Sequence, residues 1–252
     1  MLRKIAVPFI AMIVFLLLWE FLVWINGWPN YVMASPSDLP KSYIRFWDLF
    51  LVMGWQTLWR TVLGLFLAII VGVLIGMVMG FSRLMRDALY PLLVGFNAIP
   101  KATVVPIVAL MFVGAHDFNT VLIAFMISFF PIAVSVSIGL STLEPEYRDI
   151  LRSLGASQTT IFWKIALPKT LPEFFGALKV AVTLAFIGTN LMEIVSPHGR
   201  GLGALFDSGK TNSDYPLMFA VLIALAFLGI VLYYVVVALE RIFAGWAERP
   251  ES

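Results

Sequence analysis

Residues 144–172 read EPEYRDILRSLGASQTTIFWKIALPKTLP and form the only long polar segment between apolar runs that could each cross a bilayer. Its distinctive positions have a fixed spacing: Asp149-Ile150-Leu151, three residues, Gly155, nine residues, then Ile165-x-Leu167-Pro168. A charged stretch of this length does not fit inside the hydrocarbon core, so the runs on either side are predicted to be separate spans joined outside the lipid.

Two short amphipathic helices are expected in this segment. Residues 146–154 place four apolar side chains on one side at helical spacing: Tyr147, Ile150, Leu151 and Leu154. Gly155 can end that helix, because glycine adopts the left-handed conformation at little steric cost. A second helix is expected over 157–166, ending before Leu167-Pro168, since proline disfavours helical geometry in the residue before it. The pair forms either a docking surface for a partner or an ordinary loop on lipid head groups. Docking is favoured, because an ordinary amphipathic loop would rarely have the complete spacing from Asp149 to Pro168.

The spacing resembles the cytoplasmic loop signature of permease subunits from binding-protein-dependent ABC importers: E-A-A, three residues, G, nine residues, I-x-L-P. The last four signature positions match, whereas Asp149 replaces the glutamate and Ile150-Leu151 replace the alanines. The resemblance implies that a separate ATPase acts on this loop. It assigns these residues to the coupling surface: Tyr147, Asp149, Ile150, Leu151, Leu154, Gly155, Ala156, Ile165, Leu167 and Pro168.

The composition indicates an integral membrane protein. The 252 residues are 61% hydrophobic and 13% charged, against about 45–50% and about 25% in soluble domains. A net charge of +2 gives no support for nucleic-acid binding. The chain has no cysteine, and its two histidines, His116 and His198, have no ligand spacing, so no metal site is expected.

Six apolar runs are predicted to span the membrane, because about 20 residues cross the hydrocarbon core: 5–25, 56–81, 88–113, 118–141, 174–195 and 217–239. The first run has some features of a signal peptide, with Arg3-Lys4 before it and small residues at 32–34. Its apolar stretch is too long for that role, and Trp28-Pro29 intervene, so retention as a helix is expected.

Basic residues in the connections predict the orientation. With the N-terminus inside, the inner segments carry most of them: Arg3, Lys4, Arg83, Arg86, Arg148, Arg152, Lys164, Lys169, Arg241 and Arg249. The outer segments carry few: Lys41, Arg45, Arg200 and Lys210. By the positive-inside rule, both termini and the loop 144–172 are cytoplasmic.

Two features are predicted in the first half of the chain. Residues 41–55 mix aromatic and apolar side chains with a few charges, which is typical of a helix lying in the outer interface. The second span has small residues at every fourth position, forming a groove that lets another backbone approach closely: Gly64, Ala68, Gly72, Gly76 and Gly80. The partner of this groove is either in the same chain or in a second copy.

The third apolar run is interrupted by three prolines: Pro91, Pro100 and Pro106. One interpretation is a broken helix that lines the translocation pathway, with Asn97 and Lys101 deep in the membrane, where an ionisable group is usually functional. The other is a cytoplasm-side interfacial helix over 88–97 followed by a shorter span from about residue 99. In that case Lys101 lies near the inner boundary and reaches the head groups.

The fifth run carries further candidate pathway residues near its outer end: Thr189, Asn190 and Glu193. These three could face a vestibule; the simpler interpretation is that Glu193 reaches the outer head groups. Near the inner end, Lys179 is expected to reach the inner head groups in the same way.

The outer connection 196–216 contains one misleading pattern. Gly209-Lys210-Thr211 ends like a phosphate-binding loop, but Ala204 holds the position that requires glycine, no strand precedes it, and the topology places it outside the cell. Gly201-Leu202-Gly203 resembles the segment that forms the external mouth in the permease family.

The resemblance implies an all-α, type I ABC importer permease of the nitrate, sulfonate, taurine and bicarbonate branch, which also contains carriers of pyrimidine-type vitamin precursors. Within the third run and the outer connection, the segments that carry it are Ala98-Ile99-Pro100-Lys101, Val105-Pro106 and Arg200-Gly201-Leu202-Gly203. The cargo is then expected to be a small anion, with a pyrimidine-type precursor as the alternative, and the location is the bacterial inner membrane.

The implied partners are a second permease copy, two cytoplasmic ATPases that hold ATP and magnesium, a periplasmic or lipid-anchored solute-binding protein, and membrane lipids. The chain itself has no ATPase motif and is expected to bind no cofactor. Three parts are expected. Residues 1–55 form an N-terminal transmembrane helix and an outer interfacial segment, residues 56–240 form the permease core with the cytoplasmic coupling loop 144–172, and residues 241–252 form a cytoplasmic tail. An ion-coupled secondary carrier is the alternative function, although that class favours deep paired charges and inverted repeats. A membrane scaffold without transport would leave the loop spacing unexplained.

Overall fold

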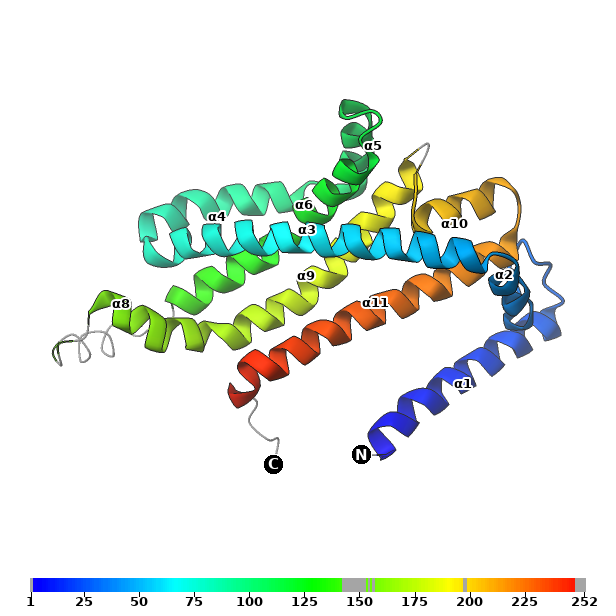
Figure 1. Cartoon of the computed structure of the whole chain (residues 1–252), viewed down its shortest axis with the longest axis horizontal. Coiled ribbons are helices and arrows are strands. Elements are labelled where there is room, and N and C mark those ends of the chain that lie inside the picture. Colours follow the sequence, from blue (N-terminus) through cyan, green and yellow to red (C-terminus); the bar gives the residue numbers. More distant parts are fainter. Residues whose placement is uncertain (1, 142–152, 154, 156, 197–198, 248–252) are drawn as a thin grey trace.

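The computed structural model describes residues 2–141, 153, 155, 157–196 and 199–247, and within these ranges the chain forms helices and no strand. The elements in chain order (Figure 1) are α1 (Leu2–Asn26), η1 (Pro36–Asp38), α2 (Leu39–Arg45), α3 (Trp47–Phe81), α4 (Arg83–Ala98), α5 (Lys101–Met111), α6 (His116–Ser141), α8 (Gln158–Ile161), η2 (Phe162–Ala166), α9 (Leu167–Val195), α10 (Leu202–Thr211), α11 (Tyr215–Ala244) and η3 (Gly245–Ala247).

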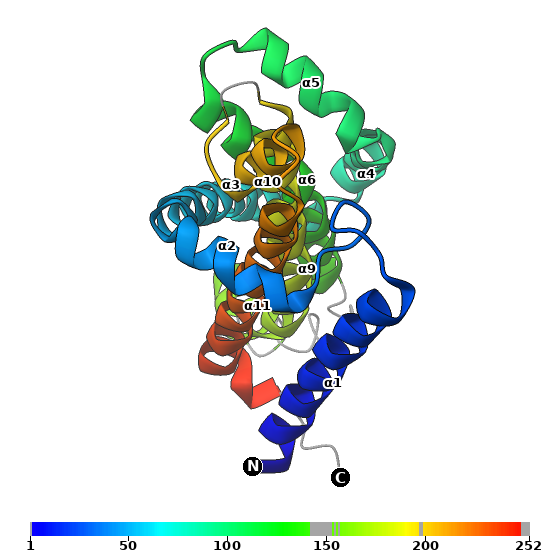
Figure 2. The same ribbon diagram turned by 90° about the vertical axis from the view of Figure 1, so that its right-hand side faces the viewer.

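The predicted membrane-spanning helical fold is confirmed. In the described part of the chain, four helical stretches are long and apolar enough to cross a bilayer: α3, α6, η2 with α9, and α11. The pair α4 and α5 counts as a fifth span if the bent pair crosses as one, and α1 is a 25-residue helix that is apolar over Ile10–Asn26. These elements correspond to the six predicted runs. Figure 2 shows α1 standing apart from the bundle formed by α3, α6, α9 and α11.

The core forms where α3, α6 and α9 pack together. The small-residue face of α3 lies against α6 of the same chain: a Cβ at Gly64 would lie 2.5 Å from Ala124 Cβ, and one at Gly72 would lie 2.9 Å from Phe129 O. The groove predicted from the sequence therefore has an intrachain partner. Small side chains allow this backbone approach, and dispersion contacts along the seam stabilise it.

The predicted outer interfacial helix over 41–55 is wrong in its second half. Helix α2 ends at Arg45, and α3 begins at Trp47 and continues for 35 residues, so the expected boundary between residues 55 and 56 lies inside one helix. No proline interrupts residues 47–55, and their apolar side chains are compatible with lipid, so the helix extends. Helix α2 is held by the Tyr43 hydroxyl, which donates to Ala220 O at 2.7 Å. Burial raises the pKa of Tyr43, so this donor stays protonated at neutral pH.

The third apolar run breaks at Ile99-Pro100, where α4 and α5 meet at 86°. In Figure 1, α5 stands almost upright, whereas α3 runs horizontally. The 11 residues of α5 correspond to about 17 Å, which is shorter than a hydrocarbon core about 30 Å thick. The bent pair is therefore a broken span or a re-entrant segment.

Lys101 lies at this break and contacts the end of α4. Its Nζ donates to Phe96 O at 2.7 Å and to Asn97 O at 3.3 Å, and lies 4.7 Å from the Phe96 ring centroid. A cation at a helix C-terminus satisfies free carbonyls and interacts favourably with the dipole. The depth of Lys101 in the membrane stays a prediction.

Lys179 forms an ion pair within the protein. Its Nζ lies 2.8–2.9 Å from the carboxylate oxygens of Glu240, and the two side chains are 27% and 14% exposed. This ion pair joins α9 to α11. Pairing across helices satisfies a lysine that would otherwise be costly in an apolar environment.

Candidate functional site

Part of the predicted coupling surface lies outside the described residues: Tyr147, Asp149, Ile150, Leu151, Leu154 and Ala156. Gly155 is described, and its φ is +83°. This is the left-handed conformation expected of a glycine at a helix end. Its role in coupling stays a prediction.

The prediction that the second helix ends before Leu167-Pro168 is wrong. Ser157 begins the segment by accepting a bond from Thr160 N at 3.1 Å, and α8 passes through the π-helical stretch η2 directly into α9. Pro168 falls in the first turn of α9, where its missing N–H is best tolerated, and the wider π turn keeps the preceding carbonyls away from its ring. The segment carrying Ile165 is therefore joined to α9 without a break.

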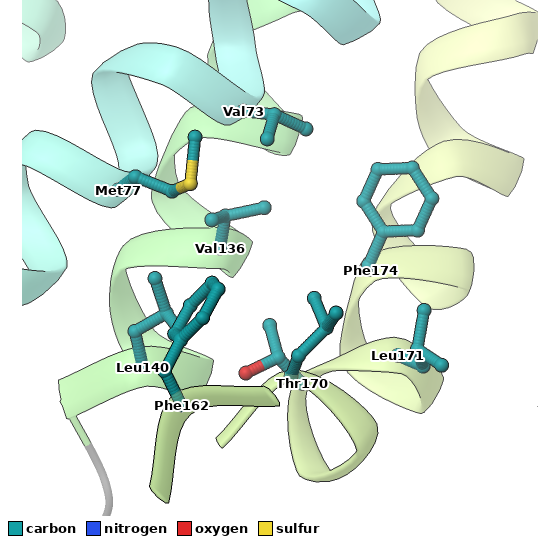
Figure 3. Close-up of a pocket in the computed structure, with 9 residues that line it drawn as sticks. Val73, Met77, Val136, Leu140, Phe162, Thr170, Leu171 and Phe174 are labelled. Carbon is teal, nitrogen blue, oxygen red and sulfur yellow. The ribbon is translucent and has the colours of Figure 1, made fainter. Parts of the chain in front are cut away.

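An apolar cavity of about 180 Å³ lies at this junction. It lies between α3, α6, η2 and α9, and Figure 3 shows side chains from these elements pointing into it. The lining residues are Val73, Met77, Val136, Leu140, Phe162, Leu167, Thr170, Leu171 and Phe174. Protein interiors have few voids of this size, so this junction is less tightly packed than a filled core.

Filling this cavity is expected to stabilise the protein. Val73→Ile adds one methyl group to the apolar wall and should raise the free energy of unfolding by about 0.5–1 kcal/mol. The measurement is the thermal midpoint of the purified permease. Val78→Ile is the control, because Val78 is on the same helix and 46% exposed, and it should leave the midpoint unchanged. A lower midpoint for Val73→Ile would show that the void does not accept the added group.

A buried charged cluster lies at the opposite end of the bundle. Arg60 of α3 lies between two carboxylates: its Nε and Nη2 lie 2.8 and 2.6 Å from Asp117 Oδ1, and its Nη1 lies 3.2 Å from Glu193 Oε1. The Thr57 hydroxyl lies 2.9 Å from Glu193 Oε2. The Arg60 and Glu193 side chains are 2% and 1% exposed, whereas Asp117 is 61% exposed. We call Thr57, Arg60, Asp117 and Glu193 the outer cluster.

The outer cluster binds the backbone of residues 200–203. Arg60 Nη1 donates to Arg200 O, Thr57 Oγ1 accepts from Leu202 N at 2.9 Å, and Glu193 Oε2 accepts from Gly203 N at 3.0 Å. The last two donors are the first N–H groups of α10, which no residue within that helix can satisfy. A carboxylate at this position also interacts favourably with the helix dipole.

The structure brings together only some of the predicted pathway residues. Glu193 does not reach the outer head groups, as the sequence favoured, because the outer cluster holds it inside. Thr189 is buried beside it and bonds Thr61 at 3.0 Å. Asn190 donates to Phe186 O at 2.7 Å. Asn97 and Lys101 lie elsewhere, at the break between α4 and α5.

Arg60 was missed by the sequence interpretation. It lies within the apolar run 56–81, and an arginine inside a predicted span is itself a signal of a buried partner. Its partners are 57 and 133 residues away along the chain, so the sequence indicated that a partner exists without identifying it.

Comparison with known proteins defines the class. Residues 64–247 match the family described as "Binding-protein-dependent transport system inner membrane component". The chain belongs to this family and is a multi-pass permease of the bacterial inner membrane. Membership implies that it works with an ATPase subunit and a solute-binding protein, which leaves the secondary-carrier alternative without support.

Particular relatives cover most of the chain. The formylaminopyrimidine transport permease protein ThiX of Halalkalibacterium halodurans is 30% identical over 96% of both chains. The riboflavin transport system permease protein RibX of Chloroflexus aurantiacus is 33% identical over 94% of this chain and 88% of its own. The taurine transport system permease protein TauC of Escherichia coli is 24% identical over 67% of this chain and 60% of its own.

The fold also matches a solved structure. An inward-facing conformation of the MetNI methionine ABC transporter superposes with a TM-score of 0.63 at 20% identity, covering 75% of this chain and 93% of that one. At this identity the likeness concerns the fold alone, and it agrees with the type I permease architecture predicted from residues 144–172, which we call the predicted coupling segment.

Proposed function

We propose that the permease carries a flat nitrogen heterocycle, of the pyrimidine or flavin type, in an ATP-driven importer. The observation that carries this proposal is the extent of the similarity: the permeases named for formylaminopyrimidine and riboflavin match over 94–96% of this chain at 30–33% identity. The taurine permease matches over only 67% of this chain, at 24% identity.

The proposal moves away from the small anion favoured by the sequence. That expectation came from the resemblance to the nitrate, sulfonate, taurine and bicarbonate branch, and a cationic Lys101 facing the pathway would have agreed with it. The Lys101 ammonium instead bonds two carbonyls of α4 and lies against the Phe96 ring, which leaves it less able to attract an anionic cargo. A sulfonate or nitrate remains the second candidate because of the similarity to the taurine permease.

In the proposed mechanism two copies of the chain form a homodimer around one pathway. Two cytoplasmic ATPases, which hold ATP and magnesium, contact the coupling segments, and an external binding protein delivers the cargo. ATP binding closes the ATPase pair and shifts the permease between inward-open and outward-open states. Each ligand shifts that equilibrium only through its differential affinity for the two states.

Uptake measurements test the cargo. The permease is expressed with its ATPase and binding protein in a host that lacks uptake of four labelled probes: formylaminopyrimidine, riboflavin, taurine and nitrate. We expect saturable uptake of one of the two heterocycles. Uptake of taurine or nitrate without either heterocycle would overturn the proposal. A matched strain with a hydrolysis-deficient ATPase should show no uptake, and continued uptake there would contradict the ATP-driven mechanism.

A further inference from the structure

We propose that the outer cluster is a positioning device: it fixes residues 200–203 to α3 and α9, so that the coupling segment, α9 and the start of α10 move as one body during transport. Residues 200–203, at the predicted external mouth, would then move whenever the cytoplasmic segment moves. This inference rests on the proposed function in one respect, that an ATPase moves the cytoplasmic end.

The first argument is the hydrogen bonding. Two buried charges, Arg60 and Glu193, are satisfied by each other, by Thr57 and Asp117, and by two backbone groups, Arg200 O and Gly203 N. Thr57 in turn accepts from Leu202 N. Removing residues 200–203 from this cluster would leave a buried carboxylate and two helix N–H groups short of partners. Unsatisfied buried groups are strongly unfavourable, and fully satisfied networks are rigid. The outer cluster is therefore expected to stay closed while larger parts of the protein move.

The second argument is the fit of the backbone against Glu193. Gly201 has a φ of +122°, and a Cβ at this position would overlap the Glu193 carboxylate. A Cβ at Gly203 would lie 2.8 Å from Glu193 Cβ, and one at Gly199 would lie 2.6 Å from Glu193 O. Three glycines thus allow the chain to pass directly over Glu193. The contact has no room for a side chain at these positions.

The third argument is continuity. Helix α9 runs from Leu167 to Val195, with Pro172 in its first turns, and its N-terminal end is joined to α8 through η2. Its other end carries Glu193. A helix of 29 residues is about 43 Å long, so one element connects the cytoplasmic segment to the outer cluster. The cavity at its cytoplasmic end (Figure 3) leaves room for movement there, whereas the outer end is tightly bonded.

Cysteine labelling tests this inference, because the chain contains no cysteine. Leu202→Cys places a thiol at a position that is 2% exposed, and Ser208→Cys places one on the exposed side of the same helix. A membrane-impermeant maleimide is applied from outside to the permease–ATPase complex, with and without ATP. We expect Cys labelling at position 208 in both states, and at position 202 in neither.

Gly201→Ala then disrupts the close contact between residue 201 and the Glu193 carboxylate, and it changes no charge. In the Leu202→Cys background it should raise the labelling rate by about tenfold, because the segment is no longer held. Glu193→Gln is the second variant, used if Gly201→Ala fails to fold, and it should act in the same direction. Gly95→Ala is the matched control, since no described atom lies within 4 Å of a Cβ built there, and it should keep the parent rate.

Two results would overturn the inference. Rapid labelling at position 202 in the parent complex with ATP would show that the segment swings away during the cycle. Slow labelling at position 202 in folded Gly201→Ala or Glu193→Gln would show that the outer cluster does not hold it. The cargo transported per ATP gives a further readout: it should fall in Gly201→Ala relative to Gly95→Ala, and an unchanged ratio would contradict the positioning role. The labelling needs no cargo, so an error in the proposed cargo leaves it unaffected.

Discussion

Replacing Gly76 by valine is expected to prevent most of the permease from reaching its folded state. A Cβ at Gly76 would lie 2.7 Å from Ala133 O and 2.7 Å from Val136 Cβ. One of these atoms is backbone in the middle of α6, so the clash is relieved only if α3 and α6 separate along the seam that forms the core. Overpacking at such a site costs about 3 kcal/mol or more. The measurement is the amount of monodisperse permease after detergent extraction, together with its thermal midpoint.

Gly54→Val is the matched control for this variant. Gly54 lies on the same helix, and no described atom is within 4 Å of a Cβ built there. Both substitutions change helix propensity by the same amount, so only packing against α6 separates them. If the two variants lost equal amounts of folded protein, the close approach of α3 to α6 would not be the cause.

The face of α3 shows how far sequence reasoning extends for the fold. Small residues at every fourth position place a groove on one side of a helix whatever its neighbours are, so Gly64 to Gly80 could be identified as a packing face. The identity of the neighbour depends on which helix presents a complementary ridge. The periodicity of α3 has no information about that ridge, which belongs to α6.

Predictions made from neighbouring residues were wrong where the folded structure satisfies the same residues in another way. Proline at 168 predicted a helix end, but a π-helical turn before it removes the steric conflict and the helix continues. The simpler interpretation of the sequence placed Glu193 at the outer head groups. Its partner, Arg60, is 133 residues away, and only the assembled bundle brings the two charges together. The candidate pathway residues were therefore harder to predict than the spans.

The coupling segment provides the second large effect: Gly155→Val is expected to abolish ATP-dependent uptake. Gly155 has a φ of +83°, and this conformation costs an ordinary L-residue about 1–2 kcal/mol and a β-branched one more. A valine would shift the backbone away from this conformation and so change the direction in which the preceding residues meet the ATPase. We expect uptake to fall at least about tenfold, while the ATPase continues to hydrolyse ATP without import. The measurements are uptake and ATP hydrolysis in the same proteoliposomes.

Gly155→Asn separates the conformational effect from the loss of glycine itself. Asparagine adopts the left-handed region more readily than other non-glycine residues, so this variant should retain most of the uptake. Gly176→Val tests whether a valine elsewhere in the same half of the chain disturbs transport, because no described atom lies within 4 Å of a Cβ built there. Normal uptake by Gly155→Val would mean that residues 144–172 do not transmit the ATPase movement. Loss of uptake in Gly155→Asn as complete as in Gly155→Val would mean that the left-handed conformation is not the property that matters.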